Sequence, residues 1–457
     1  MNRVSRRASA LLILVLFLCG GLGYFIYEYA VNAESWVVSP GSPHVYNSNN
    51  IGCGQVVDRN GDLLLDITAK RAYSTDQSVR MATMHLLGDR QGRISAPAIA
   101  HYGKEMTGYD MIDGLYSYDG SAGQAVLTVS AKVQAAALEA MGDRKGTIGV
   151  YNYKTGEILC MVTTPTYDPD QVPDIEGDET GAYEGVYLNR FVQSTYIPGS
   201  IFKIVTTAAA LDSVPGILDQ TFTCTGLYEY GIDKVSCERA HGTLSLKQAL
   251  ASSCNCSFAQ IANLVGREEL QKYADQFQIT ERVKFDGITT AKGNFDMTNA
   301  ARVEIAWGGI GQYTDLINPC RYMVFMGAIA GGGKAANPYL VSQVSIDGEI
   351  TYGAKTSYTD RIMNETIANI LTEYMRNNVS AVYGDHNFPG LTVCAKSGTS
   401  QLGGDQVSNA MFAGFVEDEA YPLAFMVVVE NGGYGSSTCV PILSKVLAAC
   451  KSVLDGK

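Results

Sequence analysis

One short stretch restricts the fold of this chain more than any other, because it joins a backbone break to a long apolar run. Pro198 and Gly199 are poor residues for the interior of a helix, since proline lacks an amide hydrogen and glycine favours turns. Residues 204–211 follow closely and are almost entirely apolar. A run of this kind is stable when it is buried, and it predicts a buried helix that begins at Ser200.

The first turn of this helix places a hydroxyl and an amine on one face. Ser200 and Lys203 are three residues apart, and the helix advances 3.6 residues per turn. Serine becomes an effective nucleophile beside a base, and lysine is such a base when burial or a neighbouring cation lowers its pKa. The alternative is a serine that caps a core helix and a lysine that extends to solvent. No other S-x-x-K occurs in the 457 residues.

A second segment with a lysine and hydroxyl groups follows the apolar run 391–395, which has the composition of a buried strand. The segment consists of Lys396, Ser397, Gly398 and Thr399. A similar Lys-Thr-Gly triplet begins at Lys154, but it precedes Ser200 and lies in a turn between two strand-like runs. The later segment is therefore the better candidate to lie beside Ser200.

A third segment, Ser253, Cys254 and Asn255, falls between two helix-like runs. The same S-x-N pattern also begins at Ser48, close to the N-terminal apolar segment. Serine acyl-transfer enzymes with an S-x-x-K nucleophile carry S-x-N and K-T-G motifs after it. Only the set that starts at Ser200, Ser253 and Lys396 has this order.

Together, these three motifs resemble those of the class B penicillin-binding proteins, which are monofunctional peptidoglycan D,D-transpeptidases of the penicilloyl serine transferase superfamily. Further stretches resemble the same family, and they are spread over most of the chain after residue 50. They are residues 55–61 (QVVDRNG), 156–161 (GEILCM), 189–203, 241–258 (HGTLSLKQALASSCNCSF), 309–312 and 412–415.

The resemblance implies how the first motif works. Ser200 attacks a carbonyl carbon of a D-alanyl-D-alanine stem peptide, and Lys203 takes the serine proton as a neutral amine, which the Lys396 cation helps to keep uncharged. Backbone N–H groups of Ser200 and Thr399 stabilise the tetrahedral oxyanion. An amine from a neighbouring strand then takes the acyl group and forms a cross-link. No metal or cofactor is expected in this reaction.

The resemblance also assigns the other two motifs. Ser253 passes a proton to the departing D-alanine, and Asn255 holds Lys203 and the substrate amide. The terminal carboxylate is bound by Lys396, Ser397, Gly398 and Thr399. Two positions depart from the pattern of the class A β-lactamases. Cys254 stands where those enzymes have aspartate, and Ser397 replaces a threonine while keeping the hydroxyl.

The N-terminal segment has the composition of a membrane anchor. Arg3, Arg6 and Arg7 precede residues 8–27, which carry no charge and are long enough to cross a bilayer. We expect an anchor over residues 8–28, with residues 1–7 in the cytoplasm and the rest of the chain outside the cell membrane. The alternative is a cleaved signal peptide with its cleavage site at residues 31–33, but the apolar run exceeds the usual length.

The rest of the chain has the composition of a folded ectodomain in two parts. It is long for a single core, which rarely exceeds about 250 to 300 residues, and the net charge of −12 argues against nucleic acid. Residues 29–145 alternate short apolar runs with Gly, Asp and Asn, which predicts a β-rich pedestal. This part is too short for a glycosyltransferase domain, so the resemblance implies a separate polymerase. Residues 146–457 form the predicted transpeptidase domain.

The second domain begins with β-rich runs at residues 147–153 and 158–163, which predict a hairpin. Helices are predicted at residues 201–211, 244–252, 258–264, 321–329 and 362–375. Strands are predicted at residues 391–395, 410–415 and 423–429, before a closing helix at about 441–454. Helices between strands from both ends of the segment predict an α+β domain with one antiparallel sheet flanked by helices. The penicilloyl serine transferase fold has this architecture.

Eleven cysteines are many for a chain that faces outward, and the number is odd. Cys19 lies in the membrane segment. Cys224 and Cys237 flank a turn-rich stretch, and the sequence leaves open whether they form a local disulfide or stay as free thiols. A zinc site of Cys224, Cys237, Cys254 and Cys256 lacks the C-x-x-C spacing that is typical of such sites, so we expect no metal there.

The motif order and the resemblance predict a membrane-anchored peptidoglycan D,D-transpeptidase of the bacterial cell wall, with a role in cell shape or division, that also binds β-lactams covalently. Its expected partners are stem peptides, an amine acceptor and a polytopic membrane glycosyltransferase. Two alternatives stay open: a β-lactam sensor or β-lactamase on the same fold, and a non-catalytic scaffold of a wall-synthesis complex. No second acid or base for deacylation is evident, and none of the five histidines follows a G-x-S-x-G elbow.

Overall fold

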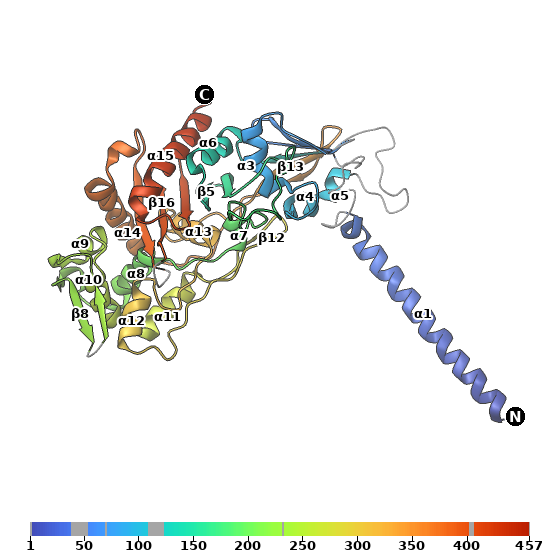
Figure 1. The fold of residues 1–457 in the computed structure, drawn as a ribbon. Helices are drawn as coiled ribbons and strands as arrows, with labels where there is room; N and C mark the ends of the chain where they lie inside the picture. Colours follow the sequence, from blue (N-terminus) through green and yellow to red (C-terminus); the bar gives the residue numbers. More distant parts are fainter. Residues whose placement is uncertain are drawn as a thin grey trace.

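The computed structural model describes residues 2–37, 54–68, 71–107, 123–230, 233–401 and 406–456. Two large β-sheets organise the body of the molecule, one of five strands and one of six. A long helix, α1, projects from the end of the body at which the six-stranded sheet lies, and helices from the middle of the chain gather at the opposite end (Figure 1). The five-stranded sheet lies between these helices and the N-terminal part.

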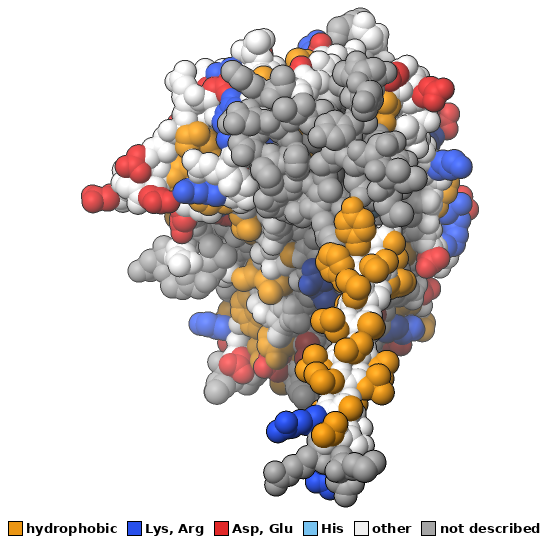
Figure 2. Space-filling model, turned by 90° about the vertical axis from the view of Figure 1, so that its right-hand side faces the viewer, with side chains coloured by type: hydrophobic (Ala, Val, Ile, Leu, Met, Phe, Trp, Pro, Cys, Tyr) orange, Lys and Arg blue, Asp and Glu red, His pale blue; other side chains and the backbone are white. Residues whose placement is uncertain are grey.

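Helix α1 spans Asn2–Val37. An 18-residue window within its segment Val4–Asn32 has a mean hydropathy of 2.4 and is not buried against the protein. Figure 2 shows apolar side chains along the described part of this helix. Such a helix is stable in lipid, because its backbone groups are satisfied internally. It matches an N-terminal membrane anchor or signal segment. Helix α15, Gly435–Leu454, is also long and apolar enough to span a membrane, but it packs on the five-stranded sheet as a core helix.

The five-stranded sheet confirms the predicted antiparallel architecture. Its order is β15 (Val393–Ser400), β16 (Asn409–Val416), β17 (Leu423–Val429), β5 (Gly146–Asn152) and β6 (Ile158–Thr164). All neighbouring strands are antiparallel, and β5 and β6 form the predicted hairpin. Successive side chains point to opposite faces. Phe412 packs in one core with α15 and with α6 (Ala131–Met141), whereas Met411 and Ala413 pack in the other with α13 (Pro319–Ala330).

The six-stranded sheet combines segments from distant parts of the chain. Its order is β14 (Glu349–Gly353), β13 (Val341–Ile346), β4 (Gly123–Leu127), β1 (Gln55–Val57), β2 (Leu63–Asp66) and β3 (Ala72–Tyr73). Two of these strands, β13 and β14, follow residue 146, so the chain returns to the N-terminal part after most of the second domain. The N-terminal part is also more helical than its short apolar runs predicted. Its helices are α3 (Gln77–Leu87), α4 (Pro97–His101), α5 (Gly103–Thr107) and α6.

Helices from the middle of the chain form the other wall of the core. They include α7 (Arg190–Gln193), α8 (Lys203–Ser213), α9 (Leu246–Ala251), α10 (Asn255–Val265), α11 (Arg267–Gln276), α12 (Arg302–Gly309) and α14 (Glu365–Asn378). One expectation is corrected, because the chain at Ser200 begins as a 3-10 helix, η1 (Gly199–Phe202), and becomes α-helical at Lys203. Helix α14 begins after Asn364, whose side chain accepts a hydrogen bond from the Ile367 N–H at 2.8 Å.

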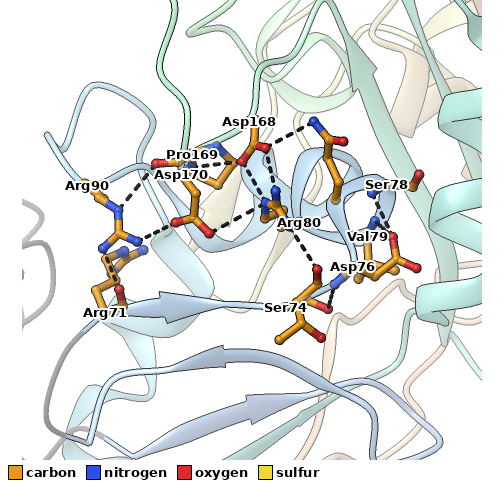
Figure 3. A network of polar contacts seen from close by, with 12 residues as sticks. Arg71, Ser74, Asp76, Ser78, Val79, Arg80, Arg90, Asp168, Pro169 and Asp170 are labelled. Carbon is orange, nitrogen blue, oxygen red and sulfur yellow. Dashed lines mark hydrogen bonds and ion pairs between the residues drawn. The ribbon is translucent and has the colours of Figure 1, made fainter.

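A polar network joins the N-terminal helix α3 to the loop after β6 (Figure 3). The Arg80 guanidinium donates two hydrogen bonds to the Asp168 carboxylate, at 2.7 and 2.6 Å. Arg90 donates to Asp170 at 2.6 Å. The side chains of Arg80 and Asp168 are 12% and 6% exposed. A bidentate pair with so little exposure is stronger than an ordinary surface ion pair.

Replacing Arg80 by methionine is expected to lower the free energy of unfolding by about 1 to 3 kcal/mol, because the buried Asp168 would lose its cationic partner and keep only the neutral donors of Gln77 and Asp170. Arg80 holds the pKa of Asp168 below its ordinary value. This stabilisation is therefore present above the ordinary carboxylate pKa of about 3.9 and is lost as the pH falls below it. Denaturant unfolding of single variants and of the double variant with Asp168→Asn measures the coupling.

The matched control is Arg93→Met, which removes an ion pair with Glu176, whose side chains are 40% and 79% exposed, together with an exposed contact with Tyr187. We expect a change of less than about 1 kcal/mol for this exposed pair. Equal losses of unfolding free energy for Arg80→Met and Arg93→Met would contradict the view that the buried pair of Arg80 and Asp168 stabilises the contact between α3 and the loop after β6.

Candidate active site

Ser200 and Lys203 lie one turn apart, with Lys203 Nζ 3.0 Å from Ser200 Oγ. The turn that carries them is packed against strand β15. Gly199 has a φ of +54°, and a Cβ at this position would lie 2.6 Å from the Thr399 carbonyl oxygen. Glycine at position 199 therefore permits the left-handed backbone and brings Ser200 beside β15.

The Lys203 amine is fully buried and has four oxygen neighbours. Nζ lies 2.7 Å from Asn255 Oδ1 and 2.7 Å from the Ser253 carbonyl oxygen. Ser200 Oγ and Ser253 Oγ are further away, at 3.0 and 3.2 Å. A neutral amine has two N–H groups and one lone pair, and the two C=O oxygens can only accept. The N–H groups are used by these oxygens, so the lone pair is left for a hydroxyl proton, and the nearer hydroxyl is that of Ser200.

A helix cap in an uncommon conformation orients Ser253. Its N–H donates to the Leu250 carbonyl at 3.2 Å, and the Cys254 N–H donates to the Ala249 carbonyl at 3.0 Å. These bonds form a Schellman motif at the end of α9, in which the left-handed position is usually glycine. Ser253 occupies that position with a φ of +53°, at a cost of about 1 to 2 kcal/mol. The cap turns both the hydroxyl and the carbonyl of Ser253 toward Lys203.

Asn255 is the first residue of α10, directly after this cap. Its side-chain Nδ2 donates to the Ser236 carbonyl at 3.0 Å, at the end of strand β9 (Asp233–Ser236). This bond fixes which end of the amide faces the site, and Oδ1 accepts from Lys203. Asn255 therefore contacts the lysine amine through its oxygen, and β9 sets that orientation.

The third motif lies on β15, a terminal strand of the five-stranded sheet. Lys396 Nζ donates to Ser253 Oγ at 3.0 Å and to the Ser397 carbonyl at 2.8 Å. Lys396 is fully buried. The Ser253 hydroxyl therefore lies between the two lysine amines, within 3.2 Å of each.

The remaining motif residues are held by neighbours outside the motifs. The Tyr383 hydroxyl accepts from the Ser397 N–H at 2.9 Å and lies 3.0 Å from Ser397 Oγ. Thr399 Oγ1 accepts from the Gly435 N–H at 3.2 Å, where α15 begins. A Cβ on Gly398 would lie 2.9 Å from the Pro198 carbonyl oxygen. Strand β15 therefore packs closely against the turn that precedes Ser200.

Burial lowers the pKa of both lysines. The pKa of Lys203 falls to about 8. The pKa of Lys396 falls well below its ordinary value because of burial and repulsion from Lys203. Two ammonium groups on one hydroxyl repel each other, so the buried pair favours a single positive charge. The hydrogen bonds of Lys203 fit the neutral amine.

The structure brings the predicted residues into one cluster. Ser200, Lys203, Ser253, Asn255 and Lys396 are connected by direct hydrogen bonds. The capped helix with a solvent-facing lysine is not found, because Lys203 is buried.

The two alternative motifs lie elsewhere or cannot be placed. The triplet at Lys154 lies in the turn between β5 and β6, where Lys154 Nζ is 3.5 Å from Glu419 Oε1 at the surface. The S-x-N pattern at Ser48 lies outside the described residues.

Two neighbours of the site did not follow from motif reasoning. Tyr383 contacts Ser397 from a turn of π-helix, Val379–Tyr383, and no sequence pattern marks it. The Gly311 carbonyl accepts from the Gly199 N–H at 2.9 Å. Gly311 belongs to the stretch 309–312, which resembles the family, and this resemblance is the sequence feature that could have indicated its place beside the site. A Cβ at Gly311 would lie 2.2 Å from the Gly199 carbonyl oxygen.

Comparison with known proteins adds independent findings. Peptidoglycan D,D-transpeptidase PbpA of Mycobacterium tuberculosis is 26% identical over 392 residues, which cover 78% of this chain and 78% of that protein. Stage V sporulation protein D of Bacillus subtilis is 27% identical over 349 residues, which cover 70% of this chain and 52% of that protein.

Solved structures of similar fold cover almost the whole chain. The imipenem acyl-enzyme complex of penicillin-binding protein A from M. tuberculosis has a TM-score of 0.75 at 23% identity, and the match covers 89% of this chain and 99% of that one. A D,D-transpeptidase domain from Eggerthella lenta has a TM-score of 0.72 at 23% identity, with 88% and 98% covered. Residues 146–448 match the family described as the penicillin binding protein transpeptidase domain. The chain belongs to this family and is a penicillin-binding transpeptidase.

Proposed function

We propose that the chain cross-links peptidoglycan as a D,D-transpeptidase, through an acyl-enzyme on Ser200. The observation that carries this proposal is the set of hydrogen bonds around Lys203 Nζ. Two carbonyl oxygens accept its N–H groups, and the lone pair is left for the Ser200 hydroxyl. Serine acyl transfer requires a nucleophile and a base within hydrogen-bond distance of each other, and Ser200 and Lys203 meet this requirement. The curated relatives named D,D-transpeptidases support the same substrate class.

The acylation step uses the five connected side chains. Ser200 Oγ attacks the carbonyl carbon of the penultimate D-alanine as its proton passes to Lys203. The C–N bond to the terminal D-alanine breaks, and the leaving amine takes a proton from Lys203 by way of the Ser253 hydroxyl. The distances of 3.0 and 3.2 Å from Lys203 Nζ to these two hydroxyls support such a relay. The oxyanion is stabilised by the backbone N–H groups of Ser200 and Thr399.

Binding of the donor depends on strand β15. Its terminal carboxylate is bound by the Lys396 ammonium together with the hydroxyls of Ser397 and Thr399, next to Gly398. The buried Lys396 amine supports a carboxylate at this position, because an anionic partner would stabilise its charged form. Asn255 binds the substrate amide as well as Lys203.

Deacylation by a second amine completes the reaction. The acceptor amine of a neighbouring stem peptide attacks the acyl carbon and gives a proton to the neutral Lys203 amine. Lys203 passes this proton to Ser200 Oγ as the ester C–O bond breaks. Among the described residues, no carboxylate hydrogen-bonds to Ser200 or Lys203 to activate water. This favours a long-lived acyl-enzyme that waits for an amine, over the fast hydrolysis of a β-lactamase.

We also propose where the enzyme works. Helix α1 anchors it in the cell membrane in a single pass, with the N-terminus in the cytoplasm and the catalytic domain outside. The arginines before the apolar run support this direction. A polytopic membrane glycosyltransferase supplies the glycan strands, since residues 29–145 are too short to form a polymerase domain.

The test is covalent labelling of the full-length protein in detergent with a fluorescent penicillin, followed by peptide mapping by mass spectrometry. We expect one stable adduct per chain, on Ser200, because β-lactams acylate the same nucleophile as the stem peptide. The M. tuberculosis relative has been solved as an acyl-enzyme with imipenem. An adduct on another residue would overturn the site, rapid turnover would favour a β-lactamase, and no adduct would favour a scaffold.

A further inference from the structure

A cluster of soft metal ligands lies directly behind the S-x-N motif. Cys224, Cys237, His241 and Cys254 each offer one ligand atom, and these atoms all lie within 4.8 Å of one another. They come from four separate points of the chain. Cys224 ends strand β7 (Thr221–Cys224), Cys237 follows β9, His241 precedes β10 (Gly242–Ser245), and Cys254 caps α10.

Two of the six spacings between these atoms match those in a tetrahedral zinc site. Zinc binds sulfur at about 2.3 Å and nitrogen at about 2.0 to 2.1 Å, so neighbouring ligands of a tetrahedron are about 3.8 Å apart for two sulfurs and about 3.5 Å for sulfur and nitrogen. The two sulfurs of Cys237 and Cys254 are 3.7 Å apart. Cys224 Sγ lies 3.5 Å from His241 Nδ1. Two sulfurs in a disulfide would be about 2.0 Å apart, and these cysteines are free.

Hydrogen-bond donors surround the sulfurs as they do around metal-bound thiolates. The Ser257 N–H and hydroxyl donate to Cys254 Sγ, at 3.4 and 3.1 Å. The Cys256 N–H donates to Cys237 Sγ at 3.3 Å. Such donors stabilise negative charge on sulfur and orient it for a metal. The Cys256 thiol differs, because it donates to the Val235 carbonyl at 3.7 Å and is not one of the four clustered ligands.

The strands around these ligands contact the main core through Phe222, Val235 and a few partly buried side chains, and they have only a small core of their own. Strands β7 and β10 form one two-stranded sheet, and β8 (Leu227–Tyr230) and β9 form another. The buried cluster at this place consists of Cys224, Cys254 and Cys256, with a few partly buried neighbours. Isolated two-stranded sheets are marginally stable, and a structural metal commonly replaces a hydrophobic core of this size.

We propose that Cys224, Cys237, His241 and Cys254 bind one Zn²⁺ ion with a closed, structural coordination shell. The sequence expectation of no metal considered Cys256 as the fourth ligand. The fold instead places His241, the first residue of the stretch 241–258, beside the other three ligands. Three thiolates and one imidazole are a common structural zinc set.

The ion would also position two residues of the proposed acyl-transfer site, a consequence that depends on the proposed function. Cys254 lies between Ser253 and Asn255, and Cys237 follows Ser236, whose carbonyl orients the Asn255 amide. Zinc would tie these two segments together and help to hold Ser253 at its φ of +53°. Cys254 is thus a positioning residue in the middle of the motif.

The test is the metal content of the full-length protein, purified in detergent without added metal or chelator. Elemental analysis is expected to find about one zinc per chain, and replacement by Co²⁺ is expected to give the absorption of a tetrahedral site with thiolate ligands. Cys224→Ser and His241→Ala should each lose the stoichiometric metal. Cys256→Ser is the matched control, because it removes a neighbouring thiol in the same small core, and it should keep the metal.

Activity is read separately, so that failure of the two proposals can be distinguished. Removal of zinc by a chelator is expected to slow acylation by a fluorescent penicillin by about 100-fold, as a displacement of about 1 Å at a catalytic group does, and added Zn²⁺ should restore it. The Co²⁺ spectrum of the unmodified protein does not depend on acylation or on how any variant folds. Absence of stoichiometric zinc, a Cys237–Cys254 disulfide in the purified protein, or metal loss in Cys256→Ser but not in Cys224→Ser would overturn the site.

Discussion

Replacing Ser200 by alanine is expected to abolish covalent labelling by penicillin and to lower the transpeptidation rate by about 10⁶-fold, as loss of the nucleophile does in other serine acyl-transfer enzymes. The physical reason is that the acyl-enzyme has no other oxygen on which to form, since Ser200 is the hydroxyl to which the Lys203 lone pair is directed. Release of D-alanine from a synthetic donor peptide in the presence of an amine acceptor measures the rate.

Ser252→Ala is the matched control for this variant. Its hydroxyl lies beside the S-x-N motif but bonds only to carbonyls of its own helix, at 2.8 Å to Gln248 and 3.5 Å to Ala249. We expect near-normal labelling. If Ser200→Ala kept the D-alanine release of the unmodified protein, the nucleophile would have to be assigned to another residue.

The pH dependence of acylation is expected to follow the Lys203 amine. Burial lowers its pKa to about 8, and only the neutral amine can take the serine proton. The acylation rate constant should therefore be low well below pH 8, rise about tenfold per pH unit as pH approaches that value, and level off above it. Because Lys203 and Lys396 interact, the measured value belongs to the pair. Stopped-flow acylation by a chromogenic β-lactam from pH 6 to pH 10 measures the profile.

Lys203→Arg is expected to remove this rise, since arginine keeps its charge over the whole range, and to slow acylation by about 10² to 10⁴-fold. Lys154→Met is the matched control, because this lysine begins the other Lys-Thr-Gly triplet and pairs only with Glu419 at the surface. It should keep both the rate and the profile. A profile for the unmodified protein that is flat from pH 6 to pH 10 would refute Lys203 as the base.

Much of the C-terminal fold could be predicted from the sequence, because its elements are long and strongly patterned. The hairpin of β5 and β6 and the strands β15 to β17 are apolar runs between turn residues, and each begins within two residues of its expected position. Strand β15 ends five residues later than expected, because it also includes the motif that begins at Lys396. The N-terminal part was harder to predict. Its sheet is completed by β13, which pairs with β4 from more than 200 residues away along the chain, and by β14, which pairs with β13. Local pattern carries no signal for such a pairing.

In the site, too, some residues could be predicted from the sequence and others depend on the tertiary structure. The order of the motifs at Ser200, Ser253 and Lys396 identified the segments in advance, because their residue types carry acyl-transfer chemistry wherever they fold. The contact of Tyr383 with Ser397 and the entry of His241 among the cysteines depend on how separate elements pack. The strained cap at Ser253 depends on two backbone bonds at the end of α9.

The sequence by itself determined the chemical groups of this protein: a hydroxyl, two amines, an amide and a cluster of thiols, placed after an apolar helix. The tertiary structure decided their state. Lysine is a cation in water, and it becomes a base only where burial disfavours the charge and two carbonyl oxygens direct its lone pair to a serine. Likewise, four soft ligands become a metal site only where strands from distant positions bring them within 4.8 Å of one another.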